Sequence, residues 1–365
     1  MKILHIIPSL HGGGAEKFCI DLCNEMSKQH DVTICSLFDV SEDMFMAKAL
    51  SPRVKVITLN KKLGLDIKIF FKLFWLISRG NFDVVNTHLR ALVYSIFAIL
   101  FAKNSFFHTV HSMADKETSK INRNLYKILF QYFKVAPVAI SKMVSDSIKA
   151  EYGQQYDICI ENGVNKPLTT SKYDDVQKEI SSYKPNASTK VFITIGRLVS
   201  EKNHIMLINV VNKLIEEGND LLLLIIGDDP VSGKPMKQQL EQYKSKRIIF
   251  LGIKENVADY LLCSDVFCLS SLYEGLPITL LEAMSLGVIT VCTPAGGIVN
   301  VIHDGENGWL SDDLSEEAFY KAIRKYLSAN EDTRKKMSFN AKQSYDEKYN
   351  IVQTSNNYIN LYRNI

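Results

Sequence analysis

The sequence predicts an α/β protein built from two Rossmann-like halves, and three observations support this fold class. Apolar runs typical of buried strands alternate with helical patterns along nearly the whole chain, which predicts parallel sheets covered by helices on both faces. Many of these runs end in glycine or small polar residues, as loops at the carboxyl edge of such a sheet do. The chain has 365 residues, which is long for one hydrophobic core and typical of two domains.

The composition is that of an ordinary soluble globular protein, with 46% hydrophobic and 23% charged residues. The formal net charge is +3, but residues 54–150 carry roughly 15 Lys and Arg against 5 Asp and Glu. Basic residues among aromatic ones fit a surface that faces anionic lipid or an anionic substrate. Because no recognised nucleic-acid motif accompanies them, we expect no nucleic-acid partner.

The seven cysteines are expected to be buried thiols in a reducing compartment, because most lie in apolar runs and none forms a Cys-x-x-Cys pair. Residues 2–8 fit a first strand better than a signal peptide. The longest apolar segment, residues 91–102, is too short to span a bilayer and is expected to form a buried helix. We therefore expect a cytoplasmic protein, with peripheral attachment to the inner face of the cell membrane as the alternative.

The first half opens with a strand, a glycine loop and a helix. The loop is Gly12-Gly13-Gly14, and Lys17 stands where a nicotinamide-binding fingerprint needs its third glycine. We therefore expect Gly13 and Gly14 to let the backbone approach an anionic group and not to bind a dinucleotide. Further strands of this half are expected at residues 32–38, 54–58, 84–87, 106–110 and 136–140.

Residues 66–79 are expected to form a helix in which basic side chains stand among four aromatic ones. This aromatic content exceeds what one buried face needs. The favoured interpretation is a core helix with a solvated basic edge. The alternative is a helix that lies on an anionic membrane surface.

His111 follows the strand expected at 106–110, where the ligand crevices of open α/β sheets are found. His108 lies three residues earlier and should face the other side of the strand, so we do not expect the two histidines to share a metal ion. A lone histidine is more often structural than functional, and a functional role for His111 is a hypothesis.

The segment 166–189 is polar, contains two prolines and is expected to be a linker. It separates an N-terminal domain at residues 1–165 from a C-terminal domain at residues 190–347. The last residues, 348–365, have the apolar spacing of a helix.

In the second half, the strand expected at 191–195 is followed by Gly196, Arg197 and Lys202. Arg can hold a phosphate with two parallel hydrogen bonds and Lys adds a point charge, so these cations could converge with a helix N-terminus on one anionic group. A surface loop with two basic residues is the common alternative. Further strands are expected at residues 221–226, 248–251, 266–269 and 288–292.

The stretch 270–287 contains two carboxylates beside the start of a predicted helix. Glu274 lies in the loop before the helix and Glu282 lies one to two turns into it, with Pro277 expected in the first turn and Gly287 at the end. The N–H groups expected to be open to a ligand at this helix start belong to Gly275, Leu276 and Ile278. Such a site suits a phosphate or a polyol. An ordinary turn with two solvated glutamates is the alternative.

Taken together, these motifs resemble those of the retaining glycosyltransferases of family 4, in family order over nearly the whole chain. The matching motifs are Gly12-Gly13-Gly14-Ala15-Glu16, the strand end at His111, Ile140-Ser141-Lys142, Asn162-Gly163-Val164, Gly196-Arg197-Leu198, Glu201-Lys202-Asn203, Ile226-Gly227-Asp228, Phe250-Leu251-Gly252, Ser271-x-x-Glu274-Gly275-Leu276-Pro277, Glu282-Ala283-Met284, Gly296-Gly297 and Gly305-Glu306-Asn307-Gly308. The C-terminal motifs are the more specific. The loop Asp228-Asp229-Pro230 departs from the family pattern, because Asp229 stands where a glycine is common.

The resemblance implies the GT-B fold, with two Rossmann-like domains that face each other across a cleft and a C-terminal helix that returns to the N-terminal domain. It implies transfer of a sugar from a nucleoside diphosphate to a hydroxyl with retained anomeric configuration. A UDP-sugar is the common donor, and a saccharide or lipid-linked saccharide of surface polysaccharide or glycolipid assembly is the expected acceptor. No cofactor or metal ion is expected, because no Asp-x-Asp pair lies in a suitable loop.

The resemblance also implies roles for single residues. Arg197, Lys202 and the helix start after Glu274 would stabilise the departing diphosphate, together with the N–H groups of Gly13 and Gly14. Glu274 would hold hydroxyls of the donor sugar, Glu282 those of the ribose, and the backbone at Gly252 and Ile253 would lie against the base. His111 would contact the donor sugar near the reacting carbon. The alternatives are a sugar-nucleotide 2-epimerase of the same fold and a non-catalytic nucleotide-sugar-binding module.

Overall fold

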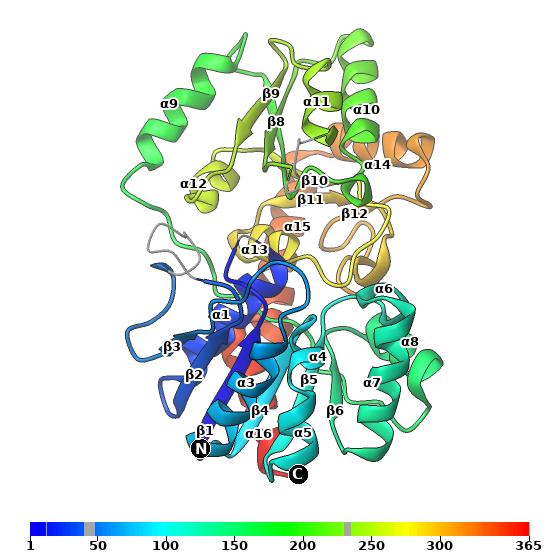
Figure 1. The fold of residues 1–365 in the computed structure, drawn as a ribbon. Helices are drawn as coiled ribbons and strands as arrows, with labels where there is room; N and C mark the ends of the chain where they lie inside the picture. Colours follow the sequence, from blue (N-terminus) through cyan, green and yellow to red (C-terminus); the bar gives the residue numbers. More distant parts are fainter. Residues whose placement is uncertain (12, 40–47, 230–234, 365) are drawn as a thin grey trace. The chain divides into compact units, whose positions relative to one another are not determined.

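The computed structural model describes residues 1–11, 13–39, 48–229 and 235–364, which form two compact units. Unit 1 contains Met1–Val164 together with Tyr349–Ile365, and unit 2 contains Asn165–Lys348 (Figure 1). Gly12 of the glycine loop and Pro230 lie outside the described residues. None of the helices in the described part of the chain combines the length and apolarity that a bilayer crossing requires.

Unit 1 is a six-stranded parallel sheet in the order β3-β2-β1-β4-β5-β6, with helices around it. Its strands are β1 (Lys2–Ile7), β2 (Asp31–Ser36), β3 (Lys55–Thr58), β4 (Val84–His88), β5 (Ser105–Val110) and β6 (Ala136–Ala139). Its helices are α1 (Gly14–Met26), α3 (Ile67–Gly80), α4 (Ala91–Tyr94), α5 (Ile96–Phe101), α6 (Ala114–Glu117), α7 (Lys120–Tyr132), α8 (Lys142–Tyr152) and α16 (Ile351–Arg363). The predicted parallel sheet is therefore present in this half.

The C-terminal helix α16 belongs to unit 1, although the whole of unit 2 precedes it in the sequence. It packs against α1, and two of its tyrosines reach the sheet. The amide of Asn86 donates to the Tyr362 hydroxyl at 2.8 Å, and the hydroxyls of Thr109 and Tyr358 lie 3.2 Å apart. These buried polar contacts fix α16 over β4 and β5.

The apolar segment 91–102 differs from its prediction, because it forms two short helices, α4 and α5. The hydroxyl of Ser95, between them, donates to the carbonyl of Ala91 at 3.0 Å. Phe101 is 73% exposed and Leu100 is 38% exposed. The segment is therefore only partly buried, and its apolar composition does not reflect one core helix.

Unit 2 is a second six-stranded parallel sheet, in the order β12-β11-β10-β7-β8-β9. Its strands are β7 (Lys190–Ile195), β8 (Leu221–Ile226), β9 (Ile248–Gly252), β10 (Val266–Leu269), β11 (Ile289–Cys292) and β12 (Trp309–Leu310). Its α-helices are α9 (Tyr173–Tyr183), α10 (His204–Glu216), α11 (Pro235–Glu241), α12 (Val257–Leu262), α13 (Ile278–Leu286), α14 (Glu316–Ser328) and α15 (Glu331–Ser344). All six residues of β8 are buried, as expected for a parallel strand with both faces covered.

The expected linker at 166–189 is wrong in part, because it contains α9, which packs on α12 within unit 2. Val176 and Ile180 are buried although most of their neighbours are polar. The Tyr260 hydroxyl donates to the Glu179 carboxylate at 2.6 Å and fixes the helix further. Two apolar residues four positions apart are enough to give a helix one buried face.

In both sheets the chain builds strands outward on one side and then returns to build the other side. The two sides meet between β1 and β4 in unit 1 and between β7 and β10 in unit 2. In open α/β sheets, ligands bind beyond the carboxyl ends of the strands at this point. The loops after β7 and β10 are therefore the first place to look for a site in unit 2.

Candidate active site

The loops after β7 and β10 bring a cation and a carboxylate into direct contact. Lys202 Nζ lies 2.5 Å from Glu274 Oε1, and the Ser271 hydroxyl donates to the same oxygen at 2.6 Å. The two charged side chains are only 15% and 11% exposed. At this burial an ion pair is screened less than one on the surface, and each partner depends on the other for its neutralisation.

Hydrogen bonds between the two loops hold this pair in place. The N–H of Leu272 donates to the carbonyl of Glu201 at 2.8 Å. The hydroxyl of Ser270 lies 3.1 Å from the carbonyl of Lys202 and 3.0 Å from that of Asn203, and these two acceptors share its single hydrogen. The loop after β7 is therefore fixed against the loop after β10 before any ligand is bound.

Glycines allow a third loop to approach the same place. Gly296 has φ +59°, and a Cβ atom at this position would lie 1.7 Å from the backbone oxygen of Glu274. Gly227 behaves similarly at the end of β8, where a Cβ atom would lie 1.8 Å from the backbone oxygen of Gly196. No side chain fits at either position, and this steric limit explains why both residues are glycine.

We predict that Gly296→Ala destabilises the protein by at least about 3 kcal/mol, because the new methyl group would displace the Glu274 backbone as well as strain its own. Gly305→Ala is the matched control: its φ is +79° and no atom lies within 4 Å of the added Cβ. That control should cost about 1 kcal/mol, the conformational penalty alone. Denaturant unfolding measures both values. Equal losses in the two variants would show that the contact with Glu274 is not rigid.

Arg197 provides a second cation at the end of β7. Its side chain is exposed, and its guanidinium forms no ion pair with any residue in the described part of the chain. Its backbone is held by His204, whose Nε2–H donates to the Arg197 carbonyl at 3.2 Å. Burial lowers the pKa of His204 to about 4, so this histidine is a neutral support at physiological pH. Arg197 is thus a cation on a fixed backbone and available to a ligand.

The helix after Glu274 begins one residue later than expected. Pro277 precedes α13 with φ −73°, and Gly287 ends the helix with φ +72°. No side chain caps the start of α13, so its first-turn N–H groups can serve a ligand. Leu276, Pro277 and Ile278 are buried, whereas Gly275 is partly exposed.

Glu282 lies within α13 and is only 6% exposed. The alternative of a solvated glutamate therefore fails for this residue. Gly252 and Ile253 stand at the end of β9, where the N–H of Gly227 donates to the Gly252 carbonyl at 2.9 Å. Ile253 is 72% exposed, which leaves an apolar surface beside the sheet edge.

Asp229, the departure from the family pattern, caps a helix. Its Oδ2 atom accepts hydrogen bonds from the N–H groups of Met236 and Lys237 at the start of α11, at 2.8 and 3.3 Å. A carboxylate at a helix N-terminus is stabilised both by these bonds and by the helix dipole. Capping of α11 therefore explains why an aspartate stands at this position in place of glycine.

The expected site residues of unit 1 lie at the corresponding edge of its own sheet. Gly13 immediately precedes α1 and Gly14 is its first residue, and no side chain caps this helix. His111 follows β5, and its ring packs edge-on against Phe18 with centroids 5.7 Å apart. Burial, followed by the charge of His108, lowers the pKa of His111 to about 3. His111 is therefore neutral and suited to hydrogen bonding, not to carrying a charge.

Sequence reasoning missed the partners of His111. Its Nε2 lies 2.9 Å from Nδ1 of His88, and the Nε2 of His88 lies 3.0 Å from Nδ1 of His5. We call these three residues the histidine chain. His108 takes other partners: it contacts the Thr87 hydroxyl at 2.9 Å and Glu117 at 3.5 Å. The signal for His88 was its place at the carboxyl end of β4, at the same edge of the sheet as His111.

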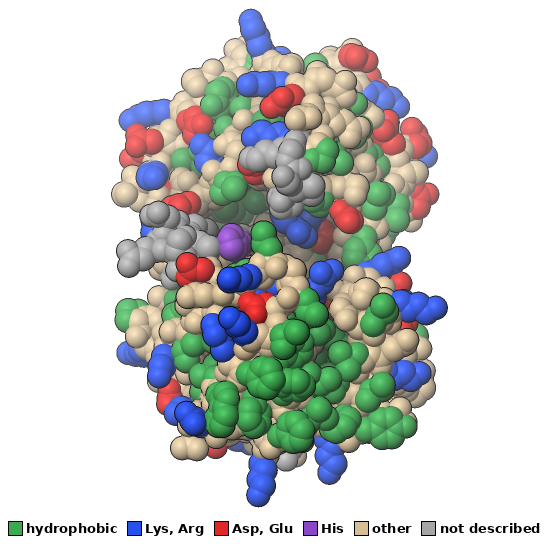
Figure 2. Space-filling model, viewed as in Figure 1, with side chains coloured by type: hydrophobic (Ala, Val, Ile, Leu, Met, Phe, Trp, Pro, Cys, Tyr) green, Lys and Arg blue, Asp and Glu red, His purple; other side chains and the backbone are tan. Residues whose placement is uncertain are grey.

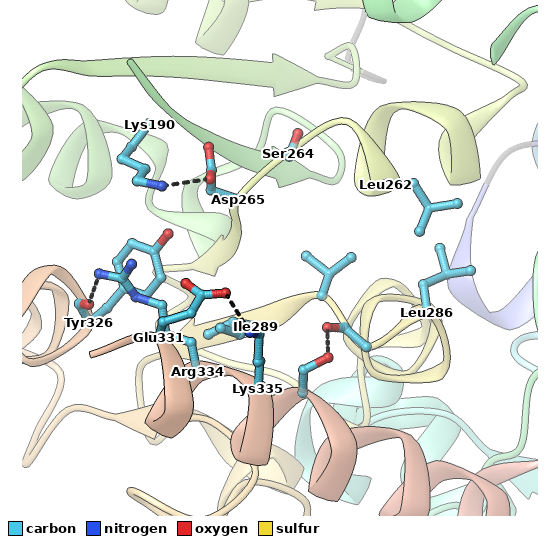
Figure 3. Close-up of a pocket in the computed structure, with 13 residues that line it drawn as sticks. Lys190, Leu262, Ser264, Asp265, Leu286, Ile289, Tyr326, Glu331, Arg334 and Lys335 are labelled. Atoms are coloured by element: carbon cyan, nitrogen blue, oxygen red, sulfur yellow. Dashed lines mark hydrogen bonds and ion pairs between the residues drawn. The ribbon is translucent and has the colours of Figure 1, made fainter. Parts of the chain in front are cut away.

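Another hollow of unit 2, shown in Figure 3, lies at the opposite edge of the sheet. Lys190 begins β7, Asp265 precedes β10 and Ile289 begins β11, whereas the site described above follows the strand ends. Its charges pair with one another, with Lys190 3.1 Å from Asp265 and Lys335 3.8 Å from Glu331. This hollow is therefore separate from the loops that carry Lys202 and Glu274.

Comparisons with known proteins agree with this geometry. A family model described as "Glycosyl transferases group 1" matches residues 175–344, and one described as "Glycosyltransferase Family 4" matches residues 12–166. The chain is similar to a GalNAc-alpha-(1->4)-GalNAc-alpha-(1->3)-diNAcBac-PP-undecaprenol alpha-1,4-N-acetyl-D-galactosaminyltransferase of Campylobacter jejuni. The two sequences are 28% identical over 357 residues, and this alignment covers 94% of this chain and 93% of the relative.

The chain is also similar to a UDP-Gal:alpha-D-GlcNAc-diphosphoundecaprenol alpha-1,3-galactosyltransferase of Escherichia coli. These sequences are 24% identical over 323 residues, and the alignment covers 83% of this chain and 81% of that relative. Among solved structures, HepE of Anabaena in complex with UDP-glucose is similar, with a TM-score of 0.85 and 19% identity over 100% of both chains. That likeness shows a common fold.

Proposed function

Because the chain belongs to glycosyltransferase family 4, we propose that it moves a sugar from a nucleoside diphosphate to a hydroxyl of a saccharide or lipid-linked saccharide, with retention of configuration. One observation carries the proposal. The Lys202–Glu274 pair, with the available cation of Arg197, lies at the carboxyl edge of unit 2 where its strand order reverses. This edge can accept a diphosphate and a polyol side by side.

Arg197, Lys202 and the first turn of α13 are proposed to stabilise the negative charge that develops on the departing diphosphate. Preorganised cations and N–H groups of this kind lower a barrier because they need not reorient during the reaction. In this proposal protein groups hold the diphosphate, and no metal ion or cofactor is required. The start of α1, at Gly13 and Gly14, is proposed as an anion-binding site of unit 1.

The carboxylates are proposed to recognise hydroxyls. Glu274, whose Oε1 is already held by Lys202 and Ser271, would accept from the donor sugar, and the buried Glu282 would accept from the ribose. The exposed Ile253 would cover one face of the base.

Because the pKa of His111 is lowered to about 3, we propose that this residue acts as a neutral hydrogen-bonding group. The acceptor proton would pass to the departing phosphate oxygen, so no residue of the chain acts as general base.

A UDP-sugar is the proposed donor, and a panel of nucleotide sugars tests this. The names of the Escherichia coli relative and of the HepE complex both contain a UDP-sugar. A ligand at 100 times its Kd should stabilise the folded protein by about 2.7 kcal/mol, which a thermal shift detects. We expect UDP-sugars to stabilise this protein most and to be consumed when an acceptor is added. Stabilisation by no nucleotide sugar, or conversion of free donor into its 2-epimer, would contradict the proposal.

The acceptor is proposed to be lipid-linked and reached at an anionic membrane, because α3 exposes a row of apolar side chains. Ile69, Leu73 and Ile77 form its buried face, while Phe71 and Trp75 are 52% and 51% exposed. Figure 2 shows hydrophobic side chains gathered on this face of unit 1, with Lys and Arg at its margin. This exposed face supports the membrane-facing interpretation of α3. Both relatives described above are named for undecaprenol-linked saccharides.

We predict that the protein floats with liposomes that contain anionic lipid and that the double variant Phe71→Ser/Trp75→Ser does so at least about tenfold less, because each exposed ring contributes apolar area and Arg79 stacks on Trp75 at 4.4 Å. Phe339→Ser is the matched control, since Phe339 lies in unit 2 and is 67% exposed. Flotation of all three proteins is measured with and without anionic lipid. Absence of binding to either liposome would end the membrane proposal and leave the donor chemistry untouched.

A further inference from the structure

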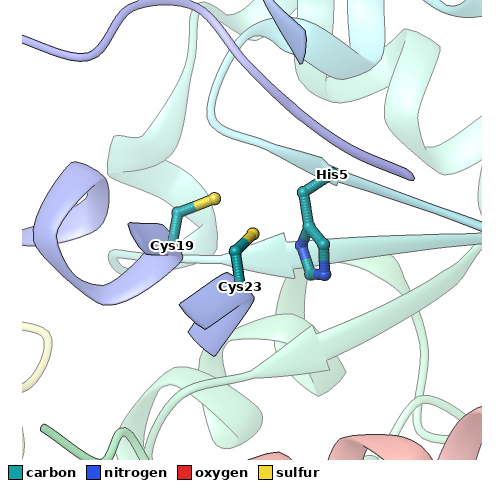
Figure 4. A group of neighbouring side chains, drawn as sticks. All are labelled: His5, Cys19 and Cys23. Carbon is teal, nitrogen blue, oxygen red and sulfur yellow. The ribbon is translucent and has the colours of Figure 1, made fainter. Parts of the chain in front are cut away.

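Three side chains that commonly bind metal ions meet in the interior of unit 1. His5 lies on β1, and Cys19 and Cys23 lie on α1, with all three fully buried. One ring nitrogen of His5 and the two sulfur atoms lie within 4.8 Å of one another. Figure 4 shows both thiols directed toward the imidazole. We call these residues the His-Cys-Cys cluster.

The secondary structure explains why the cluster is preorganised. Cys19 and Cys23 are four residues apart, so the helix places both sulfurs on one face, one turn from each other. Both thiols are free, and the face that carries them packs on β1, from which His5 projects. Donors on a helix and a strand are held more rigidly than donors on loops.

The two ring nitrogens of His5 differ in their hydrogen bonding. Its Nδ1 interacts with His88 at 3.0 Å, whereas its Nε2 has no hydrogen-bond partner in the described part of the chain. A buried polar atom without a partner costs free energy, which a ligand would recover. We assign the Nδ1 proton of His5 to the bond with His88, which leaves the lone pair of the ring on Nε2. A histidine that binds a metal typically donates its other N–H to a partner in this way.

We propose that the His-Cys-Cys cluster binds one thiophilic d10 cation, Zn²⁺ or Cu⁺, through a ring nitrogen of His5, Cys19 Sγ and Cys23 Sγ. Bonds of about 2.3 Å in a three-coordinate site place the donors about 4 Å apart, so the cluster needs to contract only slightly. Soft thiolates select these ions over Mg²⁺ or Ca²⁺. Zn²⁺ bound by two thiolates gives an electrically neutral site, but this ion usually takes a fourth ligand. Cu⁺ can be three-coordinate, but with two thiolates it leaves a net charge of about −1 on the site.

Binding must displace both thiol protons. A bound cation favours the thiolates, so both protons are released as the ion binds. Occupancy should therefore fall with acidity, and an ion once bound should be retained because no solvent reaches it.

The first experiment counts metal in the full chain. The site is closed, so the protein is produced in medium supplemented with Zn²⁺ or with copper, purified under reducing conditions and analysed by elemental mass spectrometry. We expect close to one equivalent per chain of one ion, and which ion is found decides between the two coordination numbers. Less than about a tenth of an equivalent of either would overturn the proposal.

Variants identify the ligands. Cys19→Ser and Cys23→Ser should each lower the metal content at least about tenfold. Cys35→Ser is the matched control, because Cys35 is equally buried on β2 but lies outside the cluster. Cys159→Ser, at an exposed thiol, reports adventitious binding. An equivalent that survives in both cluster variants, or that disappears with Cys159, would overturn the assignment.

A second measurement needs no variant and guards against misfolding. The metal-loaded wild-type protein is compared with protein produced in chelated medium. The loaded form should unfold at a higher temperature, since a ligand that binds only the folded state stabilises it. Identical unfolding midpoints would contradict binding at a fully buried site.

Discussion

Lys202→Ala is expected to lower turnover about 100-fold or more, or about 3 kcal/mol in the barrier, while the protein stays folded. Lys202 is largely buried and is the cation nearest Glu274, so its charge acts in a region from which most water is excluded. If it stabilises the departing diphosphate, kcat should fall by more than KM rises. Steady-state kinetics with the best donor of the panel measures both parameters.

Lys213→Ala is the matched control for this variant. Lys213 lies on the helix that follows Lys202, and its ion pair with Glu317, at 3.7 Å, is about half exposed on both sides. Removal of a surface pair costs at most about 1 kcal/mol and should leave turnover unchanged. Thermal unfolding with and without UDP shows whether Lys202→Ala remains folded and loses only ligand stabilisation. Near-wild-type turnover in folded Lys202→Ala would remove Lys202 from the mechanism.

The proximity of the candidate residues of unit 2 could be predicted from the sequence, because these residues follow strands and strand ends share one edge of a parallel sheet. Arg197, Lys202 and Glu274 were expected near one another on this ground. Their pairing was not expected: the resemblance gave Lys202 to the phosphate and Glu274 to the sugar, whereas the two are in contact. That contact depends on β7 lying beside β10, and strand order cannot be read from residue spacing.

The histidine chain and the His-Cys-Cys cluster could not be predicted from the sequence, again because strand order cannot be inferred from residue spacing. His5, His88 and His111 come from β1, β4 and the end of β5, which are separated by tens of residues and adjacent only in the folded sheet. The cysteines were expected to be buried, and five are, but Cys159 is exposed and Cys263 is half-buried. Apolar surroundings in sequence predict burial on average and do not predict which groups meet.

Two further differences came from amphipathic helices. In the expected linker, average polarity concealed Val176 and Ile180, the two residues that bury α9. In α3, average apolarity concealed a division between a buried aliphatic face and an exposed aromatic one. In both helices the apolar residues recur every four positions, and this spacing was more informative than composition.

Glu274→Gln is expected to lower kcat/KM for the donor sugar by roughly 10- to 100-fold, the effect of losing a hydrogen bond to a charged acceptor. Glutamine keeps the size of the side chain and one acceptor oxygen but removes the charge that pairs with Lys202. Lys202 would then lack its carboxylate partner and remain free to meet a phosphate. We therefore expect binding of UDP alone to be unweakened while binding and transfer of the sugar suffer, which calorimetry with UDP and kinetics with the UDP-sugar can separate.

Glu217→Gln serves as the control, because Glu217 also accepts two interactions, from Tyr320 and Arg324, but lies at the far end of α10 on the surface. It should change neither UDP binding nor transfer, as expected for an exposed pair. The diagnostic result is the contrast within Glu274→Gln itself, since a general loss of structure would weaken UDP and sugar together. Full activity with an unchanged preference among donor sugars would show that Glu274 only anchors Lys202, and sugar recognition would then have to come from other groups of the site.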